Sequence, residues 1–220
     1  MGGDLVDAFC ATKHPTGMSS DALSPDEQVE AMTDLLNQLD RQGKLGGVQT
    51  GNHDNWSDSA GYRFERFLSE LSCPVFSGEG EIDLFIAGAE KYTVWWAHTT
   101  WGNSKINITN APKRALQFNS ERADIALVGH THQASAEQFD IAGKSKVAIV
   151  GGTYKTQDSY GKKWGMGSVG LPGYTLLLWP DSKHVEVSRT PEVAQDFLLS
   201  QIYQLTTDES WVDPYTRSKK

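Results

Sequence analysis

Short apolar segments that end at potential metal ligands constrain the fold of this chain more than any other feature. The run 125–128 leads into GHTH at 129–132, and the run 92–97 leads into His98. A shorter run leads into GNHD at 51–54. Short apolar runs bounded by glycine predict buried strands, and open α/β sheets place their sites beyond the ends of such strands. The sequence therefore predicts an α/β domain with polar side chains gathered at one edge of a sheet.

Residue periodicity predicts the other elements. Apolar residues recur at helical spacing in four segments, which predicts helices over 24–41, 62–71, 111–118 and 191–203. Strand-like runs predict strands over 48–50, 82–87, 92–97, 125–128, 137–141, 147–150, 174–179 and 184–187. Helices alternate with strands in the first half and hairpins dominate the second, which is typical of two packed sheets. We expect one domain over 1–205 and a polar tail over 206–220.

Charge and composition narrow the compartment and the class of partner. The formal net charge of −8 disfavours non-specific nucleic-acid binding through Lys and Arg. It does not exclude a nuclease, because bound metal ions dominate the charge of such a site. The start MGGDLV has no signal-peptide pattern, and no apolar run approaches the ~20 residues of a membrane span. Cys10 and Cys73 lack a zinc or redox spacing, so we expect a cytoplasmic protein that does not engage a membrane.

The side chains in these motifs share one kind of chemistry. Carboxylate, amide and imidazole donors occur together, and they suit Mn, Fe or Zn. Two such ions ~3.5–4 Å apart can hold a phosphate and activate a water. Taken singly, Asp4 and Asp7 are also typical of turns. His98 alone could be a histidine at the end of a strand whose hydrogen bonds are made within the protein. His130 and His132 alternate at strand spacing, so one of them could face solvent. One convergent cluster explains all of them together.

The order of the motifs resembles a known family. GD-x-x-D at 3–7, GNHD at 51–54, a lone His98 after a strand and GHTH at 129–132 are similar to the motifs of calcineurin-like metallophosphoesterases. The resemblance is closest to bacterial or phage phosphodiesterases and SbcD-like nucleases. It implies a four-layer α/β/β/α sandwich of two mixed sheets. It also implies hydrolysis of phosphate esters, by in-line attack of a metal-bridging hydroxide.

The resemblance assigns metal ligands residue by residue. It implies that Asp4 bridges two divalent ions, that Asn52, His98 and His130 complete one site, and that His132 belongs to the other. The expected ions are Mn, Fe or Zn.

Catalytic roles follow from the same resemblance. His53 would protonate the leaving oxygen or stabilise charge on the phosphoryl group. Asp7 would orient His53 and raise its pKa. Asp54 is expected to serve the hydrogen bonding of its loop.

One family motif has no counterpart here. A strand ending in D-x-H is expected several tens of residues before GD-x-x-D, yet only Met1 to Gly3 precede Asp4 in the given sequence. We therefore expect an N-terminal βα unit to be missing, one metal site to be incomplete and a sheet edge to lie uncovered. Three explanations stay open: a truncated start, a separate polypeptide that supplies this strand, or a degenerate member. A degenerate member would hold one metal or be inactive. The alternative functions are a non-catalytic scaffold with the phosphoesterase fold and one half of a split nuclease that needs an N-terminal partner.

The substrate is constrained less sharply. Ala8 stands where protein phosphatases of the family carry a phosphate-binding arginine, which favours a phosphodiesterase. Trp56, Trp95, Trp96 and Trp101 flank the motifs and could stack on a nucleobase of a nucleotide or nucleic acid. Adjacent strand residues face opposite sides, so at least one of Trp95 and Trp96 should belong to the core. A glycine-rich segment over 154–173 either contacts phosphate or is a surface loop.

Overall fold

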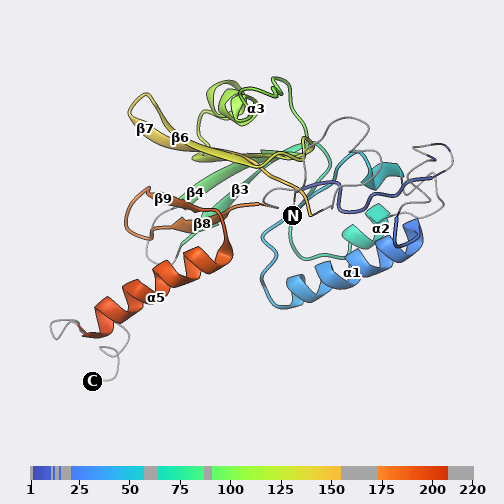
Figure 1. The fold of residues 1–220 in the computed structure, drawn as a ribbon, viewed down its shortest axis with the longest axis horizontal. Helices are drawn as coiled ribbons and strands as arrows, with labels where there is room; N and C mark the ends of the chain where they lie inside the picture. The colour runs from blue at the N-terminus through green and yellow to red at the C-terminus, as the bar shows by residue number, and fades with distance from the viewer. Residues whose placement is uncertain are drawn as a thin grey trace.

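A five-stranded mixed sheet forms the centre of this α/β protein (Figure 1). The computed structural model describes residues 2–10, 12, 15, 21–56, 64–86, 91–154 and 173–207, with side chains to 203. The strands of the sheet, in spatial order, are β3 (Glu79–Phe85), β4 (Lys91–Ala97), β5 (Ile125–Val128), β7 (Lys144–Val150) and β6 (Ser135–Ile141).

The three central strands of this sheet run parallel and end level with one another. Ala97 of β4 is in register with Val128 of β5, and Val128 is in register with Val150 of β7. β3 and β6 are antiparallel to their neighbours. Because the parallel strands end in line, the residues that follow them, including His98, meet at one edge of the sheet.

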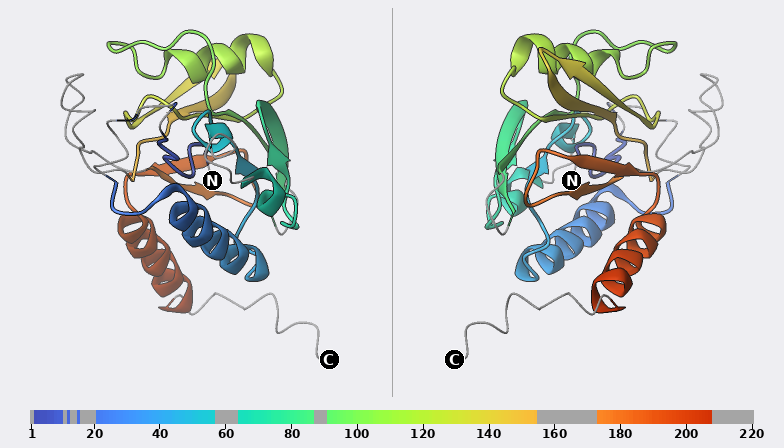
Figure 2. Two further views of the ribbon diagram at one scale, coloured as in Figure 1. Left: turned by 90° about the vertical axis from the view of Figure 1, so that its right-hand side faces the viewer. Right: turned by 90° about the vertical axis from the view of Figure 1, so that its left-hand side faces the viewer.

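Both faces of the sheet are covered, as Figure 2 shows. The helix α3 (Asn110–Arg114), continued by the π-helical turn η2 (Ala115–Asn119), packs on one face with Trp95. The hairpin β8 (Thr175–Leu178) and β9 (Val185–Ser188) packs on the other face with Trp96. Trp95 and Trp96 are therefore both core residues, 2% and 7% exposed. The expectation that at least one of them belongs to the core is confirmed, and neither is open to stack on a nucleobase, because each side of the strand has its own covering layer.

A smaller unit surrounds the N-terminal motif. The helix α1 (Pro25–Arg41) begins with a capping box of Ser24 and Glu27. It packs with α2 (Phe64–Leu68) and the N-terminal segment around buried side chains. β1 (Val48–Gln49) pairs in parallel with β2 (Val75–Phe76), and Gly2 forms a parallel bridge to Gln49. Asp4 and GNHD thus follow neighbouring extended segments.

Most elements lie where periodicity predicted them. The strand at 125–128 is confirmed with the predicted bounds, and α1 begins one residue later than predicted. Sequence reasoning missed β2, which is only two residues long. The last helix, α5 (Pro191–Thr207), runs past its predicted end at 203. The first two residues of the predicted tail over 206–220 belong to α5, and 208–220 lie outside the described residues. Residues 155–172, which make up most of the glycine-rich segment, also lie outside them. None of the described helices has the length and apolar character that a membrane span requires.

Candidate metal centre

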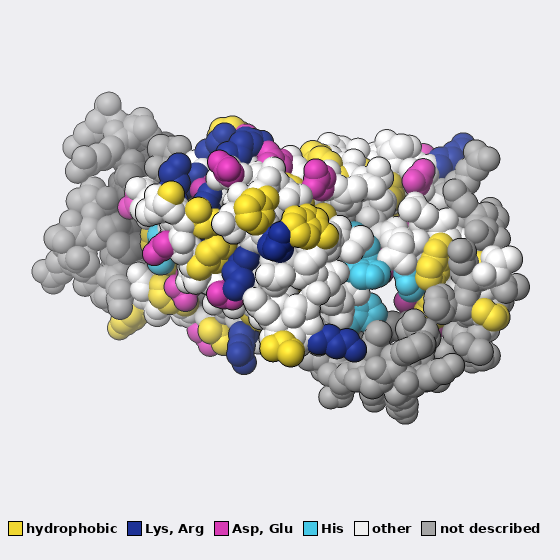
Figure 3. All heavy atoms as spheres, turned by 90° about the horizontal axis from the view of Figure 1, so that it is seen from above, with side chains coloured by type: hydrophobic (Ala, Val, Ile, Leu, Met, Phe, Trp, Pro, Cys, Tyr) yellow, Lys and Arg dark blue, Asp and Glu magenta, His cyan; other side chains and the backbone are white. Residues whose placement is uncertain are grey.

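Four of the predicted ligands meet where the two parts of the fold adjoin. Asp4 follows Gly2, which lies beside β1, and Asn52 follows β1 itself. His98 directly follows β4, and His130 comes two residues after β5. Strand ends that lie side by side therefore carry all four side chains to one place. Figure 3 shows histidine side chains gathered beside a hollow in the surface.

The Nε2 atom of His98 is the centre of the cluster. Three potential ligand atoms lie 3.1 Å from it: Oδ2 of Asp4, Oδ1 of Asn52 and Nδ1 of His130. One ring nitrogen carries at most one proton, so it can donate to only one of these atoms. A cation coordinated by these three atoms and by Nε2 of His98 would satisfy all four ligand atoms together.

The donor set fits a divalent transition metal. Ligand atoms of Asp4, His98 and His130 all lie within 4.8 Å of one another, and the carbonyl oxygen of Asn52 adds a fourth donor. One carboxylate, one amide and two imidazoles match the preferences of Mn, Fe and Zn and do not resemble a soft thiolate site. The described residues therefore include a possible metal-binding group.

Electrostatics within the group favour opposite charges on Asp4 and His98. Burial opposes ionisation of Asp4, but the hydrogen bond with His98 and the field of His53 hold its pKa below 3.8. Burial likewise opposes a charged His98, but the partner Asp4 raises the pKa of this imidazole above 6.5. Burial and the neighbouring His98 lower the pKa of His130. Asp4 is thus a carboxylate at neutral pH, and a proton on His98 is the species that a metal would displace.

Three glycines allow the close approach of the strand ends. A Cβ atom on Gly51 would collide with the carboxylate and backbone of Asp4. A Cβ on Gly3 would lie 2.8 Å from Cγ of His98, and one on Gly129 would lie 2.9 Å from the carbonyl oxygen of Gly2. Glycine before each motif is therefore required by packing.

The backbone at three of the predicted ligands is strained. Asp4, His130 and His132 have φ angles of 47°, 69° and 58°, in the left-handed region that residues other than glycine rarely adopt. Such strain clusters at functional sites, where surrounding structure enforces it. The two histidine angles show that GHTH is not an extended strand.

His132 does not join the group that the structure assembles. Its side chain is exposed, and the one metal-binding group found among the described residues contains Asp4, His98 and His130. The second metal site implied by the resemblance thus stays a prediction.

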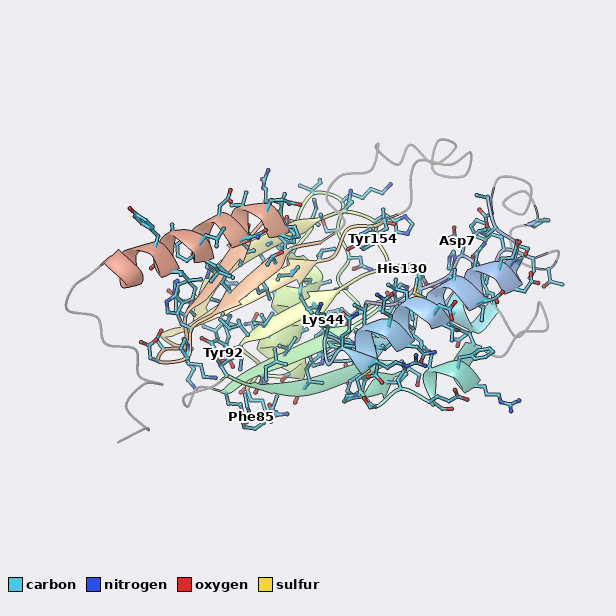
Figure 4. The ribbon with its side chains drawn as sticks, turned by 90° about the horizontal axis from the view of Figure 1, so that it is seen from below. Asp7, Lys44, Phe85, Tyr92, His130 and Tyr154 are labelled. Atoms are coloured by element: carbon cyan, nitrogen blue, oxygen red, sulfur yellow. The ribbon has the colours of Figure 1, made fainter. Side chains whose placement is uncertain are left out.

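His53 is fixed next to this group. Its backbone N–H donates to Oδ1 of Asp4 over 3.0 Å, and its Nδ1 lies 3.0 Å from the backbone carbonyl oxygen of Asp7. The carboxylate of Asp7 lies further away, with Oδ1 3.9 Å from Nδ1. The ring stacks on Trp56 with centroids 4.0 Å apart. Asp7 therefore contacts His53 mainly through its main chain. Figure 4 shows Asp7 and His130 in the same region, with Tyr92 and Phe85 toward the other end of the molecule.

Two further side chains hold the loops in place. Asp54 accepts hydrogen bonds from the backbone N–H of Val6 (3.1 Å) and Gly51 (2.7 Å), as expected of a residue that serves its loop. Burial raises the pKa of Asp54 to about 6. Gln28 of α1 accepts from the backbone N–H of Asp7 (2.9 Å) and Ala8 (3.1 Å). Sequence reasoning missed Gln28, since nothing in a helical pattern marks a side chain that binds a distant loop.

Comparison with known proteins adds no family assignment. No protein-family model and no curated protein sequence matches this chain.

Proposed function

We propose that this chain is a metal-dependent phosphoesterase of the calcineurin-like type that acts on phosphodiesters. The observation that carries the proposal is the convergence of three donor atoms on Nε2 of His98, each at 3.1 Å. Each donor comes from a different motif of the resemblance. Asp4, Asn52, His98 and His130 would hold a divalent ion, which would supply Lewis-acid chemistry and lower the pKa of water.

His53 is the proposed general acid. A carbonyl oxygen only accepts hydrogen bonds, so the contact with Asp7 places a hydrogen on Nδ1 of His53. Nε2 is then the nitrogen that gives or takes a proton. Its ring is held by Trp56 and its main chain by Asp4, which keeps the proton donor next to the ligand cluster. The leaving oxygen of the ester would take its proton from this atom.

The resemblance also supports a finer description of the fold. We propose that the layers form the α/β/β/α sandwich of this family. In support, α3 and η2 cover one face of the five-stranded sheet and the β8–β9 hairpin covers the other. The unit of α1, α2, β1 and β2 has its own core beside the site.

The test is hydrolysis of two chromogenic esters by the full chain. Bis(p-nitrophenyl) phosphate, a diester, is compared with p-nitrophenyl phosphate, a monoester, with Mn²⁺ and then with excess chelator. We expect chelator-sensitive turnover that favours the diester and is lost in His98→Ala. Turnover that persists in chelator, or in His98→Ala, would contradict the proposal.

A non-catalytic metal-binding scaffold is the second candidate. One observation favours it: the described residues supply one metal-binding group, and His132 is outside that group. The scaffold would bind one ion per chain tightly and hydrolyse neither ester. The enzyme would bind metal and also hydrolyse the diester.

A further inference from the structure

The stretch 91–120 differs in charge from the rest of this acidic chain. It contains four Lys and Arg residues and no Asp or Glu, although the whole chain has 28 acidic and 20 basic residues. The stretch begins with β4, passes through His98 and ends in η2. Lys91 pairs with Asp83 at the far end of β4, and Lys113 pairs with Glu137. Lys105 and Arg114 are the two cations of the stretch for which the described residues show no ion pair.

Within this stretch, Trp101, Arg114 and Phe118 form an exposed group, the aromatic–arginine stack. Cζ of Arg114 lies 3.6 Å from the ring centroid of Trp101 and 5.4 Å from that of Phe118. Trp101 is 58% exposed and Phe118 is 60% exposed. The two rings therefore contribute little to the core and leave apolar ring surface open to a ligand.

Within the part of the chain that the structure describes, no acid neutralises the guanidinium in the stack. No ion pair of Arg114 occurs among the described residues, and its buried Nε atom has no hydrogen-bond partner there. The neighbouring Lys113 differs, because its Nζ lies 2.9 Å from the carboxylate of Glu137. A guanidinium packed on aromatic rings keeps its charge, and its Nη groups can donate to a phosphate.

Local structure holds the stack in shape. The side-chain amide of Asn110 donates to the carbonyl oxygen of Gly102 over 2.7 Å, which ties the loop after Trp101 to α3. Gly102 has a φ of 97°, and a Cβ there would lie 2.9 Å from Cδ of Arg114. The glycine thus permits the contact between the loop and the arginine.

The stack lies close to the candidate metal centre. Trp101 follows His98 by three residues, and three residues of extended chain span at most ~11 Å. In Figure 3, apolar and basic side chains lie on the same face as the histidine group. A ligand of a few nucleotides can therefore reach from the metal ligands to the stack.

Resting on the proposed phosphodiesterase function, we infer that this stack is the subsite for single-stranded nucleic acid. Trp101 stacks on an unpaired base beside the scissile phosphate, and Arg114 binds a neighbouring phosphate. Paired bases present no free ring face to a side chain, so the subsite selects single strands over duplexes. The overall negative charge keeps non-specific binding weak, so the local stack carries the affinity.

The test is binding of a fluorescein-labelled oligothymidylate to the full chain, measured by anisotropy in chelator and low salt. Trp101→Ala is expected to weaken binding about 5- to 150-fold, the range seen when one base loses its stacking partner. Arg114→Gln is expected to reduce the slope of log affinity against log salt by ~0.7, the value for one phosphate contact on a single strand.

Matched controls are available at the far end of the molecule. Phe85→Ala removes an exposed ring, 78% exposed, and Lys144→Gln removes an exposed charge. Both should bind the oligonucleotide as the wild type does, and circular dichroism checks that all four variants are folded. A loss in Phe85→Ala as large as that in Trp101→Ala would overturn the inference.

The chelator separates this inference from the proposed function. Binding that depends on Trp101 and Arg114 supports the subsite even if the wild type hydrolyses no ester, a result that contradicts only the phosphodiesterase proposal. Wild-type hydrolysis of bis(p-nitrophenyl) phosphate together with unchanged oligonucleotide affinity in both stack variants overturns the subsite alone. Tighter binding to duplex than to single strand also overturns it.

Discussion

Oδ2 of Asp4 lies 3.1 Å from Nε2 of His98, and each residue shifts the pKa of the other toward its charged form. Asp4 belongs to the N-terminal segment beside β1, and His98 ends a strand of the central sheet. This contact therefore joins the two parts of the fold. It also places a carboxylate and an imidazole together with Asn52 and His130, in a geometry that a divalent ion would satisfy.

Metal binding should depend on His98. We expect chelator-treated protein to take up one Co²⁺ per chain at this group, with the visible absorption of a site that contains imidazole ligands. His98→Ala should abolish this absorption, because it removes the central ligand. His184→Ala is the matched control, since His184 is exposed and lies outside the group. Equal uptake by the wild type and His98→Ala would place the ion elsewhere.

The stabilisation by metal should grow with pH. The pKa of His98 is raised above 6.5, so its ion pair with Asp4 contributes full stability to the metal-free chain below pH 6.5. That contribution is lost as pH rises through the raised pKa. Metal requires neutral His98, so its effect has the opposite sign. The increase in Tm on adding Mn²⁺ should thus be larger at about pH 8 than at about pH 5.5. An increase that is largest at the lower pH would contradict this assignment.

Gly51→Ala should damage the site while the fold survives. The new Cβ would meet the carboxylate and backbone of Asp4, so Asp4 must move away from His98. Metal affinity, measured by calorimetry, should fall about 10- to 100-fold, as it does when the support of a ligand is lost. Gly46→Ala is the control, because nothing lies within 4 Å of the added Cβ. Both variants should keep the wild-type circular dichroism spectrum.

Gln28→Ala should destabilise the protein through the loop and not through the helix. Oε1 of Gln28 accepts from two backbone N–H groups, those of Asp7 and Ala8, and alanine leaves both without this acceptor. The free energy of unfolding in urea should fall by about 1–3 kcal/mol. Gln38→Ala makes the same substitution at an exposed site in the same helix and should have little effect. Equal losses in the two variants would mean that helix propensity, and not the loop, explains the effect.

His53→Ala should separate catalysis from metal binding. His53 contacts Asp4 through its backbone N–H, which the substitution retains, so metal content should stay near that of the wild type. The kcat for bis(p-nitrophenyl) phosphate should fall ~10²- to 10⁴-fold, the usual contribution of a general acid. Undiminished turnover in this variant would remove His53 from the mechanism.

The sequence was sufficient wherever the determining pattern is local. The apolar run at 125–128 predicted β5 with its bounds, and the helical spacing after Ser24 predicted α1. The ligand candidates could be chosen because each directly follows a strand or a glycine turn. Asp54 was also placed correctly in the hydrogen bonding of its loop, since one of its oxygens accepts from Gly51, three residues away. Its bond with the N–H of Val6 joins a distant segment and could not be predicted.

Only the tertiary structure decided which surfaces are covered and which partners meet. A strand pattern cannot show that both faces of β4 are buried, because α3 and the β8–β9 hairpin come from later parts of the chain. His53 donates to the backbone carbonyl oxygen of Asp7. Every residue has such a carbonyl, so residue identity cannot predict which one is the acceptor. Gln28 and the stack of Arg114 on Trp101 likewise depend on how distant segments pack. Local preferences determine elements and candidate ligands, whereas burial and hydrogen bonding between remote segments determine the geometry of the site.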